Sequence, residues 1–256
     1  MYKVFDSHFH IIDPAYPLVV NQGFTPDFFT VEQYRAELAD MGVEPVGGAV
    51  VSGSFQGFDQ SYFAGALGKL GEGFVGVTQL DPATPDEEIL KLDELGIRAI
   101  RFNLFRGLSA TLEEIEEQGR RVRELCDWKT ELYLDASQMD DEFVALVLRM
   151  PGVSIDHLGM RKGGADVLKR FVAAGVPVRV TGFGRIDYTR EEAAKLISEL
   201  YAENPQALMF GSDLPSTRAS KRFDIDDIEL ICDAVGRDHA QEVLCDNGVT
   251  WYLGEK

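Results

Sequence analysis

Two histidines separated by one residue stand near the start of the chain, in the segment Asp6-Ser7-His8-Phe9-His10. Side chains alternate along a β-strand, so residues two apart project to the same face. Both imidazoles can therefore point toward one ion or one substrate. Two polar rings buried side by side without a shared task would be costly. The spacing favours a functional pair over a pair used only for core packing.

A third histidine and an aspartate follow later apolar runs. His157 comes directly after residues 153–156, and Asp213 comes after residues 208–212. In a barrel of parallel strands, polar residues at the C-terminal ends of strands lie on the catalytic face. The structural alternatives are a helix cap for Asp213 and a hydrogen-bonded core histidine for His157. We expect His8, His10, His157 and Asp213 to share one active site.

Short apolar runs rich in Val, Ile and Phe predict eight strands. They cover residues 4–5, 45–51, 74–80, 97–104, 130–135, 152–156, 176–181 and 207–212. Amphipathic stretches between or after them predict helices at residues 31–41, 86–95, 112–127, 141–150, 165–174, 190–203 and 226–235. This alternation is typical of parallel strands joined by crossover helices.

Residues at the predicted boundaries agree with this division. Capping-box spacing predicts helix starts at four threonines, each followed three residues later by Gln or Glu: Thr30, Thr84, Thr111 and Thr189. Glycines that would close helices stand just before strands: Gly42, Gly96, Gly152 and Gly175. We expect one domain over residues 1–256, a (β/α)8 TIM barrel of the α/β class. A doubly wound sheet is the second choice, because the first crossover carries neither G-x-G-x-x-G nor a P-loop.

Composition excludes several classes of function. The chain has 256 residues, 25 basic and 43 acidic, and a net charge of −18, which repels a phosphate backbone. No apolar run approaches the roughly 20 residues that a membrane span needs. Three cysteines without Cys-x-x-Cys spacing look like reduced thiols, and the first residues lack the pattern of a signal peptide. We expect a cytoplasmic protein that binds neither nucleic acid nor membrane.

Three segments resemble the signature strands of the amidohydrolase-related branch, or amidohydrolase 2 branch, of the amidohydrolase superfamily. They are residues 6–10, 155–159 and 210–215. The end of the chain, residues 244–253, is similar to the closing helix of that branch. The branch is similar in pattern to 2-pyrone-4,6-dicarboxylate hydrolase and related lactonases, and more distantly to decarboxylases. The resemblance implies a hydrolase on a (β/α)8 barrel.

The resemblance also limits the metal content. Members with two metals place a carboxylated Lys or a Glu on a middle strand, and residues 97–103 and 131–135 offer neither at a C-terminal end. At most one divalent ion is therefore expected, and the branch contains both mononuclear enzymes and metal-independent lactonases. His8, His10, His157 and Asp213 together form a set of three nitrogens and one oxygen. That set suits zinc, or manganese with weaker preference.

Arginines lie in and after the predicted strands of this acidic chain. Guanidinium groups bind carboxylates bidentately, so the set indicates a small anionic, carboxylated substrate. Arg101 and Arg179, within strands, are the better candidates, and Arg185, Arg218 and Tyr133 are further predicted contacts. Each arginine alone could instead be a solvated or ion-paired surface residue. The wider set also contains Arg106, Arg161, Arg222 and Tyr188.

These observations predict hydrolysis of a C–O bond in a small carboxylated lactone or ester. Asp213 would be the general base, and the three histidines would hold one ion or polarise the carbonyl directly. Amide cleavage is a close variant, and a non-oxidative decarboxylase or hydratase is the enzyme alternative. A barrel that binds a metal or ligand without turnover is the non-enzyme alternative. A homodimer is the default expectation for the assembly.

Overall fold

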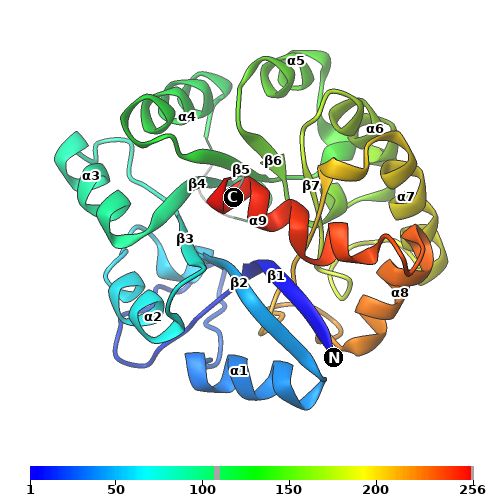
Figure 1. Cartoon of the computed structure of the whole chain (residues 1–256). Helices are drawn as coiled ribbons and strands as arrows, with labels where there is room; N and C mark the ends of the chain where they lie inside the picture. The colour runs from blue at the N-terminus through cyan, green and yellow to red at the C-terminus, as the bar shows by residue number, and fades with distance from the viewer. Residues whose placement is uncertain (107–109, 255–256) are drawn as a thin grey trace.

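Eight parallel strands form one sheet in which each strand pairs with the next along the chain. The computed structural model describes residues 1–106 and 110–254. The strands are β1 (Tyr2–Phe9), β2 (Val43–Val51), β3 (Phe74–Thr78), β4 (Ile97–Asn103), β5 (Lys129–Tyr133), β6 (Val153–Ile155), β7 (Val178–Val180) and β8 (Leu208–Phe210). Helices surround the sheet, as Figure 1 shows. The predicted (β/α)8 barrel is confirmed.

The outer helices follow the strands in alternation. They are α1 (Val31–Asp40), α2 (Tyr62–Leu70), α3 (Asp86–Leu95), α4 (Leu112–Cys126), α5 (Asp141–Arg149), α6 (Ala165–Ala173), α7 (Arg190–Glu203) and α8 (Ile225–Val235). In the part of the chain that the structure describes, none of the helices combines the length and the apolar character needed to cross a lipid bilayer.

Most of the predicted helix boundaries are confirmed. Thr30, Thr111 and Thr189 each form a complete capping box with the residue three positions later. The prediction at Thr84 is wrong, because α3 begins at Asp86 and Pro85 is its N-cap. Proline has a fixed φ near −65°, which suits the start of a helix. Pro85 is therefore the N-cap residue, one position after the threonine that the spacing had indicated. The glycines at the predicted helix ends have φ between 72° and 107°: Gly42, Gly96, Gly152 and Gly175.

Helix α2 was not predicted. Its sequence contains Gly65 and Gly68, and glycine weakens a helix pattern because it lowers intrinsic propensity. Gly65 is used for close packing, since a Cβ there would lie 2.6 Å from the hydroxyl of Tyr16. The helix instead buries Phe63 and Leu67 against the barrel. Tertiary packing therefore outweighs local propensity at this position.

The seam between β8 and β1 closes the barrel. The amide of Asp213 donates to the carbonyl of His8 at 2.7 Å, and the amide of His10 donates to the carbonyl of Leu214 at 2.7 Å. Asp6 adds a side-chain link, because its carboxylate accepts from the amide and hydroxyl of Ser212 at 2.8 and 2.6 Å. The contacts that close the barrel are thus made by the same short segments that carry His8, His10 and Asp213.

A C-terminal helix covers the end of the barrel that lies opposite to His8, His10 and Asp213. After a π-helical turn at Glu242–Asp246, α9 (Asn247–Leu253) lies across the barrel in Figure 1. It stands at the N-terminal ends of the strands, because Asn247 donates to the carbonyl of Leu208 at 2.8 Å. Phe5 stacks on the ring of Tyr252 at 5.6 Å. An apolar interior cluster joins this helix to β1–β4: Phe5, Ala49, Val51, Val75, Val77, Ala99, Cys245 and Tyr252.

Candidate active site

The structure brings His8, His10 and Asp213 together at the C-terminal ends of β1 and β8. Nε2 of His8 lies 3.8 Å from Oδ1 of Asp213, and Nε2 of His10 lies 3.7 Å from the same oxygen. The two imidazole rings are 5.2 Å apart. Gly211 permits this approach, because a Cβ at that position would lie 2.8 Å from Cβ of His8. All three side chains are almost fully buried, with at most 3% of each residue exposed.

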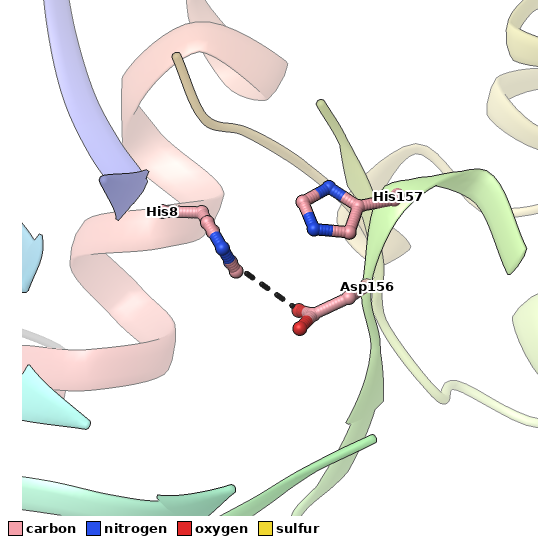
Figure 2. Close-up of side chains that lie close together, drawn as sticks. All are labelled: His8, Asp156 and His157. Carbon is pink, nitrogen blue, oxygen red and sulfur yellow. Dashed lines mark ion pairs between the residues drawn. The ribbon is translucent and has the colours of Figure 1, made fainter. Parts of the chain in front are cut away.

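Each of the two histidines has an oxygen atom beside its other nitrogen, at hydrogen-bond distance for His10 and at a longer ion-pair distance for His8. Nδ1 of His10 lies 2.7 Å from the carbonyl oxygen of Val51, which can only accept, so this nitrogen carries the proton. Nδ1 of His8 lies 3.5 Å from Oδ1 of Asp156, and Figure 2 shows this pair. A carboxylate beside Nδ1 favours the proton on that nitrogen. Both residues then present an Nε2 lone pair toward Asp213.

His157 lies beside this group, at the start of the turn that follows β6. Its ring is 4.6 Å from that of His8 and 5.0 Å from that of Tyr133. Its φ of 51° lies in the left-handed region, as does the φ of 57° of Asp213. Such conformations cost about 1–3 kcal/mol and cluster at functional sites. Gly182 leaves room for the ring, because a Cβ there would lie 2.6 Å from Nδ1 of His157.

The donor atoms form two overlapping groups with the spacing of a metal site. One group contains His8, His10 and Asp213, and the other contains His8, Asp156 and His157. No single group contains all four predicted ligands, since His157 falls in the group with His8 and Asp156. In the first group the buried Nε2 of His8 and Oδ1 of Asp213 have no hydrogen-bond partner among the described residues. These orphaned atoms and the nitrogen and oxygen donors fit a single divalent ion.

Burial and neighbouring charges set the protonation of the site. Burial lowers the pKa of His8 to about 4 and holds the pKa of His157 well below its ordinary value. Burial alone would raise the pKa of Asp213, but Arg185 and His157 outweigh burial, and that pKa lies below its usual range. At neutral pH the site therefore combines the uncharged imidazoles of His8 and His157 with the ionised carboxylate of Asp213.

Two of the predicted substrate contacts reach this site. Nη2 of Arg185 lies 2.6 Å from Oδ2 of Asp213, a close ion pair without the direction of a hydrogen bond, and also donates to the carbonyl of Thr217 at 2.8 Å. Tyr133 is buried beside His157, and its hydroxyl has no hydrogen-bond partner among the described residues. The guanidinium of Arg101 lies 4.9 Å over the Tyr133 ring. Arg185 and Tyr133 thus face the space beside Asp213 and His157.

Other predicted arginines lie farther from the histidines or deeper in the barrel. Arg179 is fully buried below the site, where all of its described contacts are internal. Arg218 donates to Asn21 and lies 4.5 Å over the ring of Phe24. Burial lowers the pKa of Arg218, and the positive charges of Arg106 and Arg185 lower it further. Arg218 therefore lies within electrostatic range of both Arg106 and Arg185.

The remaining residues of the wider set have other partners. Arg222 forms a two-point contact with the carboxylate of Glu37 on α1. Arg161 lies 3.9 Å from the carboxylate of Asp187, and the hydroxyl of Tyr188 donates to the carbonyl of Arg161 at 3.0 Å. These contacts place them around the rim, and none of them involves the four predicted catalytic residues.

Sequence reasoning missed Asp156 and Glu131. Asp156 stands next to His157 in the motif of residues 155–159, and this adjacency is the signal that could have found it. Its carboxylate accepts from Nε of Arg101 at 3.0 Å and from Nη1 of Arg179 at 3.1 Å. Glu131 lies on β5, two residues before Tyr133, and forms an ion pair with Arg179. Both carboxylates are fully buried.

Comparison with known proteins identifies the family of the chain. The family model described as Amidohydrolase matches residues 5–248. The 2-pyrone-4,6-dicarboxylate hydrolase of Comamonas testosteroni is 24% identical over 158 residues, which are 60% of this chain and 51% of that protein. The chain thus spans about half the length of this relative.

Solved structures share the fold at low sequence identity. An Acinetobacter baumannii protein, described as a probable 2-pyrone-4,6-dicarboxylic acid hydrolase with citric acid bound, superposes with a TM-score of 0.82 at 21% identity. The likeness covers 98% of this chain and 99% of that one. An apo structure from Agrobacterium tumefaciens gives a TM-score of 0.84 at 18% identity, over 99% of this chain and 96% of that chain.

The segment matched by the family model includes strands β2–β8, the histidine pair that ends β1 and the aspartate that follows β8. The family match extends over nearly the whole chain. The chain belongs to the amidohydrolase family.

Proposed function

We propose that this protein hydrolyses the C–O bond of a small carboxylated lactone or ester. The observation that carries the proposal is the position of Asp213, an ionised buried carboxylate 3.7 and 3.8 Å from the Nε2 atoms of His10 and His8. A carboxylate placed beside imidazole lone pairs can take a proton from a water molecule held between them. The name of the Comamonas testosteroni relative supports a lactone as the substrate class.

Each residue has a defined part in this reaction. Asp213 removes a proton from water while the water oxygen bonds to the carbonyl carbon. The ring C–O bond then breaks, and the departing oxygen takes the proton back from the Asp213 carboxyl group. His157 has both ring nitrogens free among the described residues, so it can donate to the carbonyl oxygen as negative charge develops there.

The orientation of the histidine pair favours one of the two roles predicted for it. A proton on Nδ1 leaves Nε2 of His8 and of His10 as acceptors, which hold water or a metal ion but cannot donate to a carbonyl. His8, His10 and Asp213 would therefore hold one divalent ion, with zinc as the first candidate. A divalent ion bound there would lower the pKa of water and polarise the carbonyl group.

The arginines support an anionic substrate. Arg106 and Arg185 lie close enough to Arg218 for their positive charges to lower its pKa, in a chain whose net charge is −18. A carboxylate of the substrate would form charge-assisted hydrogen bonds with these guanidinium groups. The citric acid in the Acinetobacter baumannii structure is a small carboxylated molecule bound by a protein of the same fold. We accordingly assign Arg185, Arg218 and the hydroxyl of Tyr133, which is unpartnered among the described residues, to the binding of substrate carboxylates.

The test is a hydrolysis screen on purified protein, combined with elemental analysis. Carboxylated lactones are compared with neutral lactones of matched ring size, and turnover is followed by base uptake at constant pH. Hydrolysis of the carboxylated series supports the proposal. Release of carbon dioxide without base uptake would indicate a decarboxylase, and saturable binding without turnover would indicate a binding protein.

A further inference from the structure

A layer of buried charges lies directly below His8. Asp156 is held there by two guanidinium groups, from Arg101 on β4 and Arg179 on β7. Each of its oxygens has a charged donor, and all three residues are at most 4% exposed. A carboxylate clamped in this way cannot rotate freely. Its Oδ1 faces Nδ1 of His8, as Figure 2 shows.

Arg179 is the centre of this layer. It donates from Nη1 to Asp156 and to the hydroxyl of Ser154 at 2.9 Å, and from Nε to the carbonyl of Ser7 at 3.2 Å. Its Nη2 pairs with Glu131 on β5. The guanidinium therefore joins residues from β1, β5 and β6 while it is itself on β7. The carbonyl of Ser7 directly precedes His8, so Arg179 contacts both the backbone and the carboxylate that orient this histidine.

The C-terminal helix reaches the same group. The hydroxyl of Tyr252 on α9 contacts both Nη2 of Arg179 and the carboxylate of Glu131. The Tyr252 ring stacks on Phe5 of β1, so the side chain has little freedom to move. A continuous set of contacts thus runs from α9, at the N-terminal ends of the strands, through Tyr252, Arg179 and Asp156 to His8.

We infer that Arg179 is a positioning residue that fixes Asp156 against His8, and that Tyr252 fixes Arg179 from the C-terminal helix. The inference rests on the proposed function for the part that His8 plays in the reaction. Partners of this kind set the tautomer and direction of a histidine, and their loss typically costs about 10- to 100-fold in activity or metal affinity. Arg179 does not touch the substrate in this arrangement, because its three guanidinium nitrogens all have internal partners.

The position of the His8 proton tests the inference without a substrate. The chain contains four histidines, so a sample labelled with 15N-histidine gives few signals. Long-range proton–nitrogen correlations show which ring nitrogen carries the proton in the full chain after dialysis against a chelator. We expect the His8 proton on Nδ1 in the wild type. In Arg179→Met we expect a second population with the proton on Nε2.

Tyr252→Phe is the milder variant, and it decides the question if Arg179→Met does not fold. It keeps the ring that stacks on Phe5 and removes the hydroxyl that contacts Arg179. We expect a change in the same direction as in Arg179→Met, but smaller. In both variants kcat should fall more than KM rises, by about 10- to 100-fold for Arg179→Met.

Two variants control for general loss of stability. Trp251→Phe changes the neighbouring residue of α9, whose ring lies under the amino group of Lys129 at 5.3 Å. Arg98→Met removes a half-buried arginine of β4 that pairs with Asp93 at 3.1 Å. Both should lower the free energy of unfolding while leaving the His8 proton on Nδ1.

Three outcomes would overturn the inference. They are a wild-type His8 with its proton on Nε2, a folded Arg179→Met or Tyr252→Phe protein with an unchanged His8 tautomer, and an equal tautomer change in the two control variants. Failure of the wild type to hydrolyse any lactone would instead contradict the proposed function. The tautomer measurement would still decide the role of Arg179 in that case.

Discussion

Arg185 and Asp213 form a buried ion pair, with Nη2 2.6 Å from Oδ2, at the C-terminal face of the barrel. The two oxygens of Asp213 thereby face different partners, since Oδ1 lies near the two histidines and Oδ2 near the arginine. The positive charge keeps the carboxylate ionised, because it holds the pKa of Asp213 below the usual range. Arg185 therefore influences the same group that we propose as the general base.

Asp213→Asn should keep the fold and slow the chemical step. Asparagine preserves the size of the side chain but removes its basicity, so kcat should fall by about 10²–10⁴ while KM changes less. Asp135→Asn is the matched control, because that carboxylate caps a turn by accepting from the amide of Ser137 at 3.0 Å. A folded Asp213→Asn protein with more than about a tenth of the wild-type kcat would contradict the base role.

The pH profile of kcat/KM gives a second measure of the same role. A base works only while it is ionised, and the pKa of Asp213 lies below its ordinary value of 3.8. The acid limb should therefore lie below about pH 4. A limb centred near pH 6 that survives in Asp213→Asn would assign the proton acceptor to another group.

Arg185→Met and Arg218→Met should weaken the use of carboxylated substrates. Each variant removes a charge-assisted contact worth about 1.5–3 kcal/mol, so kcat/KM should fall by about 10- to 100-fold. Arg222→Met is the control, because its guanidinium is bound to Glu37 on α1. Equal turnover of neutral and carboxylated lactones by the wild type, with unaffected variants, would show that these arginines do not bind substrate.

Elemental analysis should give no more than one divalent ion per chain. His8, His10 and Asp213 provide one complete group, whereas Asp156 in the second group already pairs with Arg101 and Arg179. His10→Ala should abolish any stoichiometric ion and leave the barrel folded. Two ions per chain, both needed for activity, would contradict a mononuclear site.

Much of the fold was predictable, because hydrophobic periodicity and caps are local signals. Gly42, Gly96, Gly152 and Gly175 marked helix ends correctly. Helix α2 escaped prediction because Gly65 and Gly68 mask its periodicity, and the exposed face of a short helix carries little signal. The expectation that polar residues at the C-terminal ends of parallel strands share one face also predicted that His8, His10 and Asp213 lie together. It does not establish what each residue does.

The charged layer below the site was not predictable in the same way. Arg179 and Glu131 are 48 residues apart in sequence, and Arg179 and Tyr252 are 73 apart. Their pairing depends on barrel closure, which places inward-facing side chains of different strands in one layer. From sequence alone Arg179 is equally compatible with a substrate contact, whereas the structure gives each of its guanidinium nitrogens an internal partner.

Gly211→Ala should damage the site through its backbone. An added Cβ would lie 2.8 Å from Cβ and 2.9 Å from the amide nitrogen of His8, so β8 and β1 must separate. We expect lower stability and a fall in kcat. Gly68→Ala is the matched control, because its Cβ would meet nothing within 4 Å and alanine favours a helix by about 0.5–1 kcal/mol. Equal thermal midpoints for the two variants would contradict this reading of Gly211.

Glu131 should make stability depend on pH. Burial raises the pKa of Glu131 to about 7 from an ordinary 4.5, although Arg179 acts in the opposite direction. Between these values the native state binds a proton that the unfolded chain does not bind. The free energy of unfolding contributed by this group is therefore fully present below about pH 4.5 and is lost as the pH rises through about 7.

Glu131→Gln isolates this contribution from the general repulsion of an acidic chain. Glutamine resembles the protonated carboxyl group, so the variant should lose the part of the pH dependence that belongs to Glu131. The measurement is urea unfolding of both proteins at several values from pH 5 to pH 8. The stability of the wild type relative to Glu131→Gln should decrease as the pH rises across this range. A difference between the two proteins that stays constant, or grows with pH, would show that Glu131 is ionised throughout and that Arg179 outweighs its burial.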